Sequence, residues 1–172
     1  MKKVFLIGYM GVGKTTLGKR LANALELPFS DLDKEIVKME SLSIKEIFSQ
    51  SGELHFRELE SRMLKDFCNR KESFVLSTGG GTVTSIGNME SMKAAGLVVW
   101  LDMPLEIILS RLAQSEDRPL LENVQAEDRR GFIEAHFAER LHHYQEAHIR
   151  FDSANVSAEK LAELVRVCQR SL

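Results

Sequence analysis

Apolar and polar positions along this chain form blocks that switch between strand-like and helix-like patterns. Short apolar runs between polar stretches predict strands at 3–7, 28–31, 73–77, 97–102 and 148–152. Apolar residues recurring every three or four positions predict helices at 14–25, 33–40, 43–50, 53–70, 86–94, 104–113, 127–147 and 157–170. Strands that alternate with helices indicate an α/β fold, with a parallel sheet that is covered by helices on both faces.

This order of elements also says where a ligand should bind. In open α/β sheets ligands lie beyond the carboxyl ends of the strands. With 172 residues and no linker-like segment, we expect residues 1–172 to form one domain. The polar stretch 114–126 separates two predicted helices and has the length and polarity of a mobile lid.

Composition narrows the classes of protein. The formal net charge is −2 and charged residues make up 28% of the chain, so there is no electrostatic case for nucleic acid as a partner. The sequence has no long apolar span and no signal-like start, and we expect no membrane partner, a cytoplasmic location and a monomer. Cys68 and Cys168 lie far apart in helical patterns, where idle thiols are the expected state.

The most specific motif follows the first predicted strand. Residues 8–15 read GYMGVGKT, which satisfies G-x-x-x-x-G-K-[ST] between a strand and a helix. Its glycines let backbone N–H groups surround phosphate oxygens, and the N-terminus of the next helix adds partial positive charge. Lys14 can reach the β- and γ-phosphates and Thr15 can ligate Mg²⁺. The chain is therefore expected to bind a nucleoside triphosphate.

Two carboxylates close the second predicted strand. Alternation along a strand points Asp31 and Asp33 in the same direction, toward the expected nucleotide. One could hold Mg²⁺ through water while the other accepts a proton from an attacking hydroxyl. The alternative is helix capping, because Asp33 precedes a helical pattern and would make a good N-cap.

Three further segments carry candidate binding groups. Arg57 and Glu60 are i,i+3 neighbours, so Glu60 could hold the guanidinium as a clamp for a carboxylate, although a solvated surface ion pair is the simpler alternative. The run Gly79-Gly80-Gly81 could bring backbone donors close to a substrate, or be a plain turn. Arg118 in the polar stretch could close onto a transferring phosphoryl group, or be a surface residue.

Taken together, these segments resemble shikimate kinase along the whole chain. The resemblance rests on GYMGVGKT at 8–15, DLD at 31–33, Phe56-Arg57 with Glu60, GGG at 79–81, RPLL at 118–121, and Arg140 four residues before Tyr144. It implies a P-loop fold like that of nucleoside-monophosphate kinases, with five parallel strands in the order 2-3-1-4-5 and a lid. It also implies transfer of the γ-phosphoryl group of ATP to the 3-hydroxyl of shikimate, in aromatic amino acid biosynthesis.

The resemblance also assigns roles to individual residues. Lys14, Asp33 and Arg118 would be catalytic, and Thr15 with Asp31 would hold Mg²⁺. The nucleotide would contact a set formed by Gly11, Val12, Gly13, Lys14, Thr15, Thr16, Arg111, Arg118 and Asn155. Shikimate would be bound through a region at roughly 33–62 and beyond, by Asp33, Arg57, Gly79, Gly80 and Arg140. The histidines of the chain, His136 among them, form no metal-ligand pattern.

Two other functions stay open from the residues alone. Another small-molecule kinase of the same fold, such as a gluconate kinase, would share the phosphate loop. A nucleotide-binding module without an acceptor would need neither Asp33 nor Arg118.

Overall fold

The computed structural model describes residues 2–113, 124–125, 127–155 and 157–168. Its five strands are β1 Lys3–Ile7, β2 Phe29–Asp31, β3 Phe74–Ser77, β4 Leu97–Asp102 and β5 Ile149–Asp152. Its helices are α1 Lys14–Leu25, α2 Leu32–Glu40, α3 Ile44–Asn69, α4 Asn88–Ala95, α5 Leu105–Ala113, α6 Arg129–Gln145 and α7 Ala158–Cys168, with a short 3-10 helix η1 at Thr82–Thr84.

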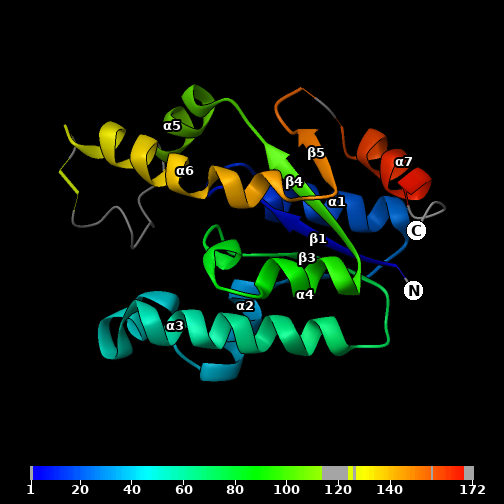
Figure 1. Ribbon diagram of the computed structural model, residues 1–172, viewed down its shortest axis with the longest axis horizontal. Coiled ribbons are helices and arrows are strands. Elements are labelled where there is room, and N and C mark those ends of the chain that lie inside the picture. The colour runs from blue at the N-terminus through cyan, green and yellow to red at the C-terminus, as the bar shows by residue number, and fades with distance from the viewer. Residues whose placement is uncertain (1, 114–123, 126, 156, 169–172) are drawn as a thin grey trace.

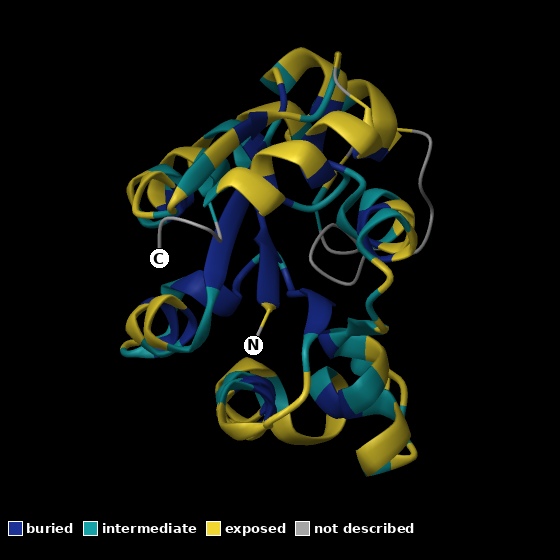
Figure 2. Cartoon of the chain, turned by 90° about the vertical axis from the view of Figure 1, so that its right-hand side faces the viewer, coloured by how far each residue is buried: buried dark blue, intermediate teal, exposed yellow. Residues whose placement is uncertain are grey.

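The strands form one parallel sheet in the order β2-β3-β1-β4-β5, which confirms the predicted fold class and strand order. Every residue of the central strand β1 is buried, as expected for a strand covered on both faces. Helices α3 and α4 lie on one side of the sheet and α1 and α7 on the other (Figure 1). Figure 2 shows the buried strands at the centre and the exposed residues on the outer faces of the helices.

Helix α3 confirms the two helical segments predicted at 43–50 and 53–70. They adjoin at Gly52, whose φ of 80° and ψ of 172° are not helical, so α3 is a kinked pair of helices. Ser43 caps its N-terminus with Glu46 in a capping box, so that two backbone N–H groups without helical partners are satisfied.

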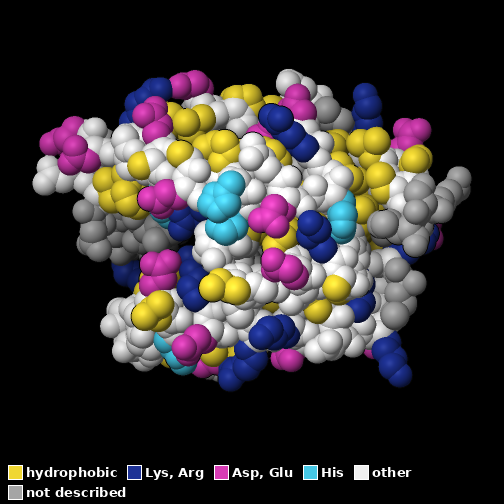
Figure 3. Space-filling model, viewed as in Figure 1, with side chains coloured by type: hydrophobic (Ala, Val, Ile, Leu, Met, Phe, Trp, Pro, Cys, Tyr) yellow, Lys and Arg dark blue, Asp and Glu magenta, His cyan; other side chains and the backbone are white. Residues whose placement is uncertain are grey.

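Charged side chains of both signs are distributed over the surface of the molecule (Figure 3). Acidic and basic side chains are interspersed over the face shown in Figure 3, without a broad field of one sign. Within the described residues, no helix is both long enough and apolar enough to cross a membrane. Most of the stretch expected to be a lid, residues 114–123 and 126, lies outside the described residues, and so does Arg118.

Candidate active site

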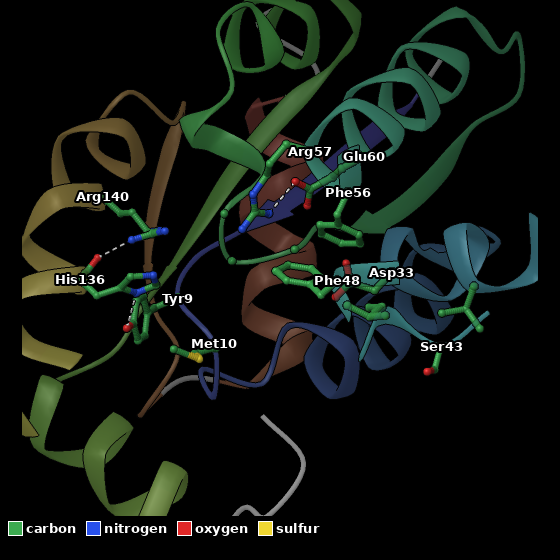
Figure 4. Close-up of a pocket in the computed structure, with 15 residues that line it drawn as sticks. Tyr9, Met10, Asp33, Ser43, Phe48, Phe56, Arg57, Glu60, His136 and Arg140 are labelled. Carbon is green, nitrogen blue, oxygen red and sulfur yellow. Dashed lines mark hydrogen bonds and ion pairs between the residues drawn. The ribbon is translucent and has the colours of Figure 1, made fainter. Parts of the chain in front are cut away.

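Two adjoining cavities open at the carboxyl edge of the sheet. The first, of about 300 Å³, follows the phosphate loop and is lined by Lys14, Thr15 and Asp31 among others. The second, of about 390 Å³, lies between α2, α3 and α6 and is shown in Figure 4. Four residues line both cavities, and they are Met10, Asp33, Gly79 and Gly80. A molecule in one cavity would therefore meet a molecule in the other next to Asp33.

The phosphate loop has the geometry that its sequence predicts. Gly13 caps α1 with a φ of 91°, a left-handed conformation that favours glycine. The ammonium of Lys14 donates hydrogen bonds to the carbonyl oxygens of Gly8 at 2.7 Å and Tyr9 at 2.9 Å. The hydroxyl of Thr15 donates to Asp31 Oδ2 at 2.6 Å. A cation, a hydroxyl and a carboxylate thus meet at the N-terminus of a helix.

The structure corrects the predicted secondary structure around Asp31 and Asp33. Asp31 ends β2 and is itself the N-cap of α2, accepting from the N–H of Lys34, so capping by Asp33 is wrong. Asp33 lies in the first turn of α2, and strand alternation does not orient it. The helix begins at Leu32, one residue earlier than predicted, because Asp31 already supplies the capping carboxylate. Both carboxylates still line the phosphate-loop cavity.

The ionised form of Asp33 is destabilised by burial and by neighbouring carboxylates. Its Oδ1 atom is buried and has no hydrogen-bond partner among the described residues. Burial raises the pKa of Asp33 to about 6, and the nearby carboxylates of Glu60 and Asp31 add to the shift, while Lys14 and Arg57 oppose it. A hydroxyl group placed where the two cavities meet could donate to this oxygen and relieve its isolation.

One wall of the second cavity is built by α3. Arg57 Nη1 donates to Glu60 Oε2 at 2.8 Å, and the Glu60 side chain is 0% exposed. Glu60 also accepts from the hydroxyl of Thr82, and Glu53 Oε1 accepts from Arg57 Nη2 at 2.9 Å. The expectation that Glu60 steadies the guanidinium is confirmed, and the alternative of a solvated surface pair is wrong because the acceptor is fully buried. Arg57 is therefore a fixed cation at the cavity wall.

The glycine run packs tightly against this wall. A side chain at Gly81 would place its Cβ 2.5 Å from Nη2 of Arg57, so only glycine leaves room for the guanidinium. Gly79 and Gly80 line both cavities, and the carbonyl of Gly80 accepts from the hydroxyl of Tyr144 at 2.6 Å. The run is therefore a site of close approach and not a plain turn.

Helix α6 builds the opposite wall, which carries Arg140 and His136 (Figure 4). Arg140 is buried, and its Nη1 donates to the carbonyl of His136 at 2.9 Å. Its Nε has no hydrogen-bond partner among the described residues. Two arginines from α3 and α6 thus face one cavity that has Asp33 at its inner end, an arrangement suited to a carboxylate-bearing molecule with a hydroxyl group.

A further cavity of about 410 Å³ lies on the other side of the phosphate loop. It is lined by Val12, Gly13, Thr16 and Arg111, and Arg111 Nη1 donates to the carbonyl of Gly11 at 3.1 Å. Asn155 does not line this cavity, although it was expected beside the nucleotide. It is exposed and donates to Asp152 Oδ2 at 3.0 Å.

Sequence reasoning missed several cavity residues. His136 belongs to the cavity wall although it forms no ligand pattern in the sequence, and Phe48 and Phe56 give the cavity an apolar floor with ring centroids 5.0 Å apart. The spacing of His136 four residues before Arg140 was the available signal, because residues at i and i+4 share a helix face. The two phenylalanines match ordinary core positions, so the pattern did not distinguish them.

The fold and this geometry define a phosphate-loop kinase for a small anionic acceptor. A family model described as shikimate kinase matches residues 10–169. A shikimate kinase from Sulfurihydrogenibium sp. (strain YO3AOP1) is 42% identical over 163 residues, which is 95% of each chain. One from Aquifex aeolicus (strain VF5) is 39% identical over 95% of this chain and 94% of its own. This chain belongs to the shikimate kinase family.

Solved structures agree with this assignment. The shikimate kinase of Acinetobacter baumannii, solved in complex with shikimate, has a TM-score of 0.87 at 35% identity, covering 99% of this chain and 94% of its own. The Bacteroides thetaiotaomicron enzyme gives 0.84 at 34% identity, covering 98% and 97%. A gluconokinase from Sinorhizobium meliloti matches with a TM-score of 0.53 at 15% identity, covering 98% of this chain and 94% of its own, and so shares the fold alone.

Proposed function

We propose that this chain transfers the γ-phosphoryl group of ATP to the 3-hydroxyl of shikimate, giving ADP and shikimate 3-phosphate in aromatic amino acid biosynthesis. One observation carries the proposal. The phosphate-loop cavity and the cavity with two arginines meet at Asp33, whose buried Oδ1 lacks a partner among the described residues. An acceptor hydroxyl and a γ-phosphoryl group would meet there.

Asp33 would act on the acceptor hydroxyl. Its carboxylate would accept the hydrogen bond of that hydroxyl and take up the proton as the oxygen attacks the γ-phosphorus and the bond to the β–γ bridging oxygen breaks. A carboxyl whose pKa is raised to about 6 is a stronger base than an ordinary aspartate and is still ionised near pH 7. Burial that is costly in the free protein thus supplies basicity for the reaction.

Lys14 and the N-terminus of α1 would bind the phosphates. In the free protein Lys14 donates to two carbonyl oxygens of its own loop, and these bonds hold the ammonium at the loop's centre until phosphate oxygens replace the carbonyls. Gly11, Val12, Gly13 and Thr16 would surround the phosphates, and Arg111 would flank the base. Arg118, known here from sequence alone, would contribute a further cation on the transferring group.

The residues at 15 and 31 fit a magnesium ion. The Thr15 hydroxyl lies 2.6 Å from a carboxylate oxygen of Asp31, and both are the oxygen donors that Mg²⁺ prefers. Mg²⁺ usually takes one or two protein ligands and its other ligands from phosphates and water. When bound, the ion would offset the negative charge on the phosphates.

Arg57 and Arg140 would hold the carboxylate of shikimate from opposite walls of the cavity. Each guanidinium presents planar N–H donors, and a carboxylate accepts them in pairs. Glu60 and Glu53 hold Arg57, so that little side-chain freedom is lost on binding. The two arginines would set the distance between the carboxylate and the hydroxyl at Asp33, and they would so favour this acceptor over others.

A coupled assay of ADP release tests the proposal. The purified chain with ATP and Mg²⁺ should release ADP rapidly with shikimate and at background rate with gluconate, with a nucleoside monophosphate, or without acceptor. Equal turnover with gluconate would show that shikimate is not the specific acceptor. Nucleotide binding without any acceptor-dependent ADP release would make the chain a nucleotide-binding module.

A further inference from the structure

His136 is placed to take part in acceptor binding. It lies one helical turn before Arg140 on α6 and lines the same cavity. Its Nδ1 atom is 2.7 Å from the hydroxyl oxygen of Tyr9, in the phosphate loop. Its ring also stacks on Phe132, with centroids 5.3 Å apart and an interplanar angle of 21°. These two contacts hold the ring in position, and Figure 4 shows His136 between Tyr9 and Arg140.

The hydrogen bond to Tyr9 decides which ring nitrogen carries the proton. Tyr9 is 1% exposed, and burial raises the pKa of its phenol well above the usual range, so the hydroxyl keeps its proton. Among the described residues, His136 Nδ1 is the one hydrogen-bond partner of that hydroxyl. A buried hydroxyl without an acceptor is costly, so Tyr9 donates and Nδ1 accepts. The ring proton of a neutral His136 is then on Nε2.

Burial first, and neighbouring cations second, keep the imidazole neutral. Burial lowers the pKa of His136 to about 4, and the cations Arg140 and Arg57 also disfavour a charged ring, while Glu53 acts in the opposite direction. Near pH 7 the cavity wall therefore carries a neutral imidazole with one N–H donor, next to a buried arginine. A neutral donor adds a directed hydrogen bond without a third positive charge.

We propose that His136 is a substrate-binding residue whose Nε2–H donates to the acceptor's carboxylate beside Arg140, with Tyr9 fixing the donor tautomer. The inference rests on the proposed function, because the carboxylate is that of shikimate. A carboxylate has about four acceptor positions, and Arg140 together with Arg57 need not fill all of them. His136 thereby selects a planar carboxylate held at a fixed distance from the phosphate loop.

Four proteins test this in the coupled assay: the parent, His136→Leu, His136→Gln and His142→Leu. Leucine keeps an apolar side chain but has no donor, so the KM for shikimate should rise about tenfold, as expected when a hydrogen bond to a charged group is lost, with kcat and the KM for ATP nearly unchanged. Glutamine can place an amide N–H near the position of Nε2 and should restore most of the affinity. The exposed His142 on the same helix is the matched control and should change nothing.

A second measurement is independent of turnover. ¹⁵N-histidine NMR of the parent at pH 7 should show His136 as the neutral Nε2–H tautomer, and shikimate should shift the Nε2 resonance. Tyr9→Phe should reduce the population of that tautomer. An unchanged KM in His136→Leu, a glutamine variant no better than leucine, or an Nδ1–H tautomer would overturn the inference. If the parent itself neither binds nor phosphorylates shikimate, the proposed function fails instead.

Discussion

Replacement of Asp33 by Asn should damage catalysis and stabilise the free protein at the same time. The amide keeps the size of the side chain but cannot take up the hydroxyl proton, so kcat should fall by about 10²–10⁴-fold. In the free protein the same change removes a buried charge that lies near two other carboxylates and has one oxygen without a partner among the described residues. We therefore expect Asp33→Asn to unfold at a higher temperature than the parent.

The magnitude follows from the raised pKa. A carboxyl whose pKa moves from 3.8 to about 6 on folding costs about 3 kcal/mol above pH 6, since each pKa unit corresponds to about 1.4 kcal/mol. An amide left without partners would cancel about 1 kcal/mol of this gain. The remaining ~2 kcal/mol corresponds to roughly 4–8 °C in Tm for a domain of this size.

The dependence on pH separates this cause from better packing. Between pH 4 and 6 folded Asp33 binds more protons than unfolded Asp33, so the parent loses stability as pH rises through that window. The difference in Tm between variant and parent should be small at pH 4.5 and complete above pH 7. Thermal unfolding without ligands measures it, with the exposed Asp66→Asn as control. A difference that is independent of pH, or a destabilised variant at pH 7.5, would refute the reasoning.

The remaining predictions concern the cations and the histidine of the site. Lys14→Ala should abolish turnover and weaken ATP binding, a loss of about 3 kcal/mol or more, and a folded variant with near-parent kinetics would contradict its role. Arg57→Met and Arg140→Met should each raise the KM for shikimate at least tenfold with little change in the KM for ATP, because a charged hydrogen bond is worth roughly 1.5–3 kcal/mol. A raised KM for ATP with an unchanged KM for shikimate would contradict their role in carboxylate binding. Of the two, Arg57→Met should lower Tm more, since it leaves Glu60 buried without its cation. His136 has a folded-state pKa of about 4, below its unfolded value, so the parent loses stability as pH falls from about 6.5 toward 4. The variant His136→Leu lacks this group, so its free energy of unfolding should fall over that range by about 1–2 kcal/mol less than that of the parent, after allowing for partial exposure.

Local patterns in the sequence were enough for the fold and the phosphate loop. The apolar runs and the motif at 8–15 are contiguous, so each element could be predicted without knowing its neighbours. The Arg57–Glu60 pair was predictable for the same reason, because i,i+3 spacing places both on one helix face. Burial of Glu60 was not, since it depends on the hydroxyl of Thr82 and on packing against a distant loop.

Two features of the site could not be predicted from the sequence, because they depend on how distant elements pack together. Asp33 was the predicted N-cap, but β2 leaves the sheet at Asp31, and this is where the helix is capped. Tyr9 and His136 are 127 positions apart, and only the return of α6 across the carboxyl edge brings them together. The sequence therefore predicted Arg140 as a cavity residue but not the contact of its helix with the phosphate loop.

The two walls of the acceptor cavity are supported in different ways, and the difference bears on how the reacting groups are aligned. Arg57 is held by carboxylates of its own helix. Helix α6 is instead attached to the two glycine-rich loops, through Tyr9 to His136 and through Tyr144 to the carbonyl of Gly80. These bonds connect the helix that carries Arg140 to the phosphate loop and to the loop at Gly80. Under the proposed function they would hold the carboxylate clamp at a set distance from the γ-phosphoryl group, where a misplacement of about 1 Å can cost 10²-fold in rate.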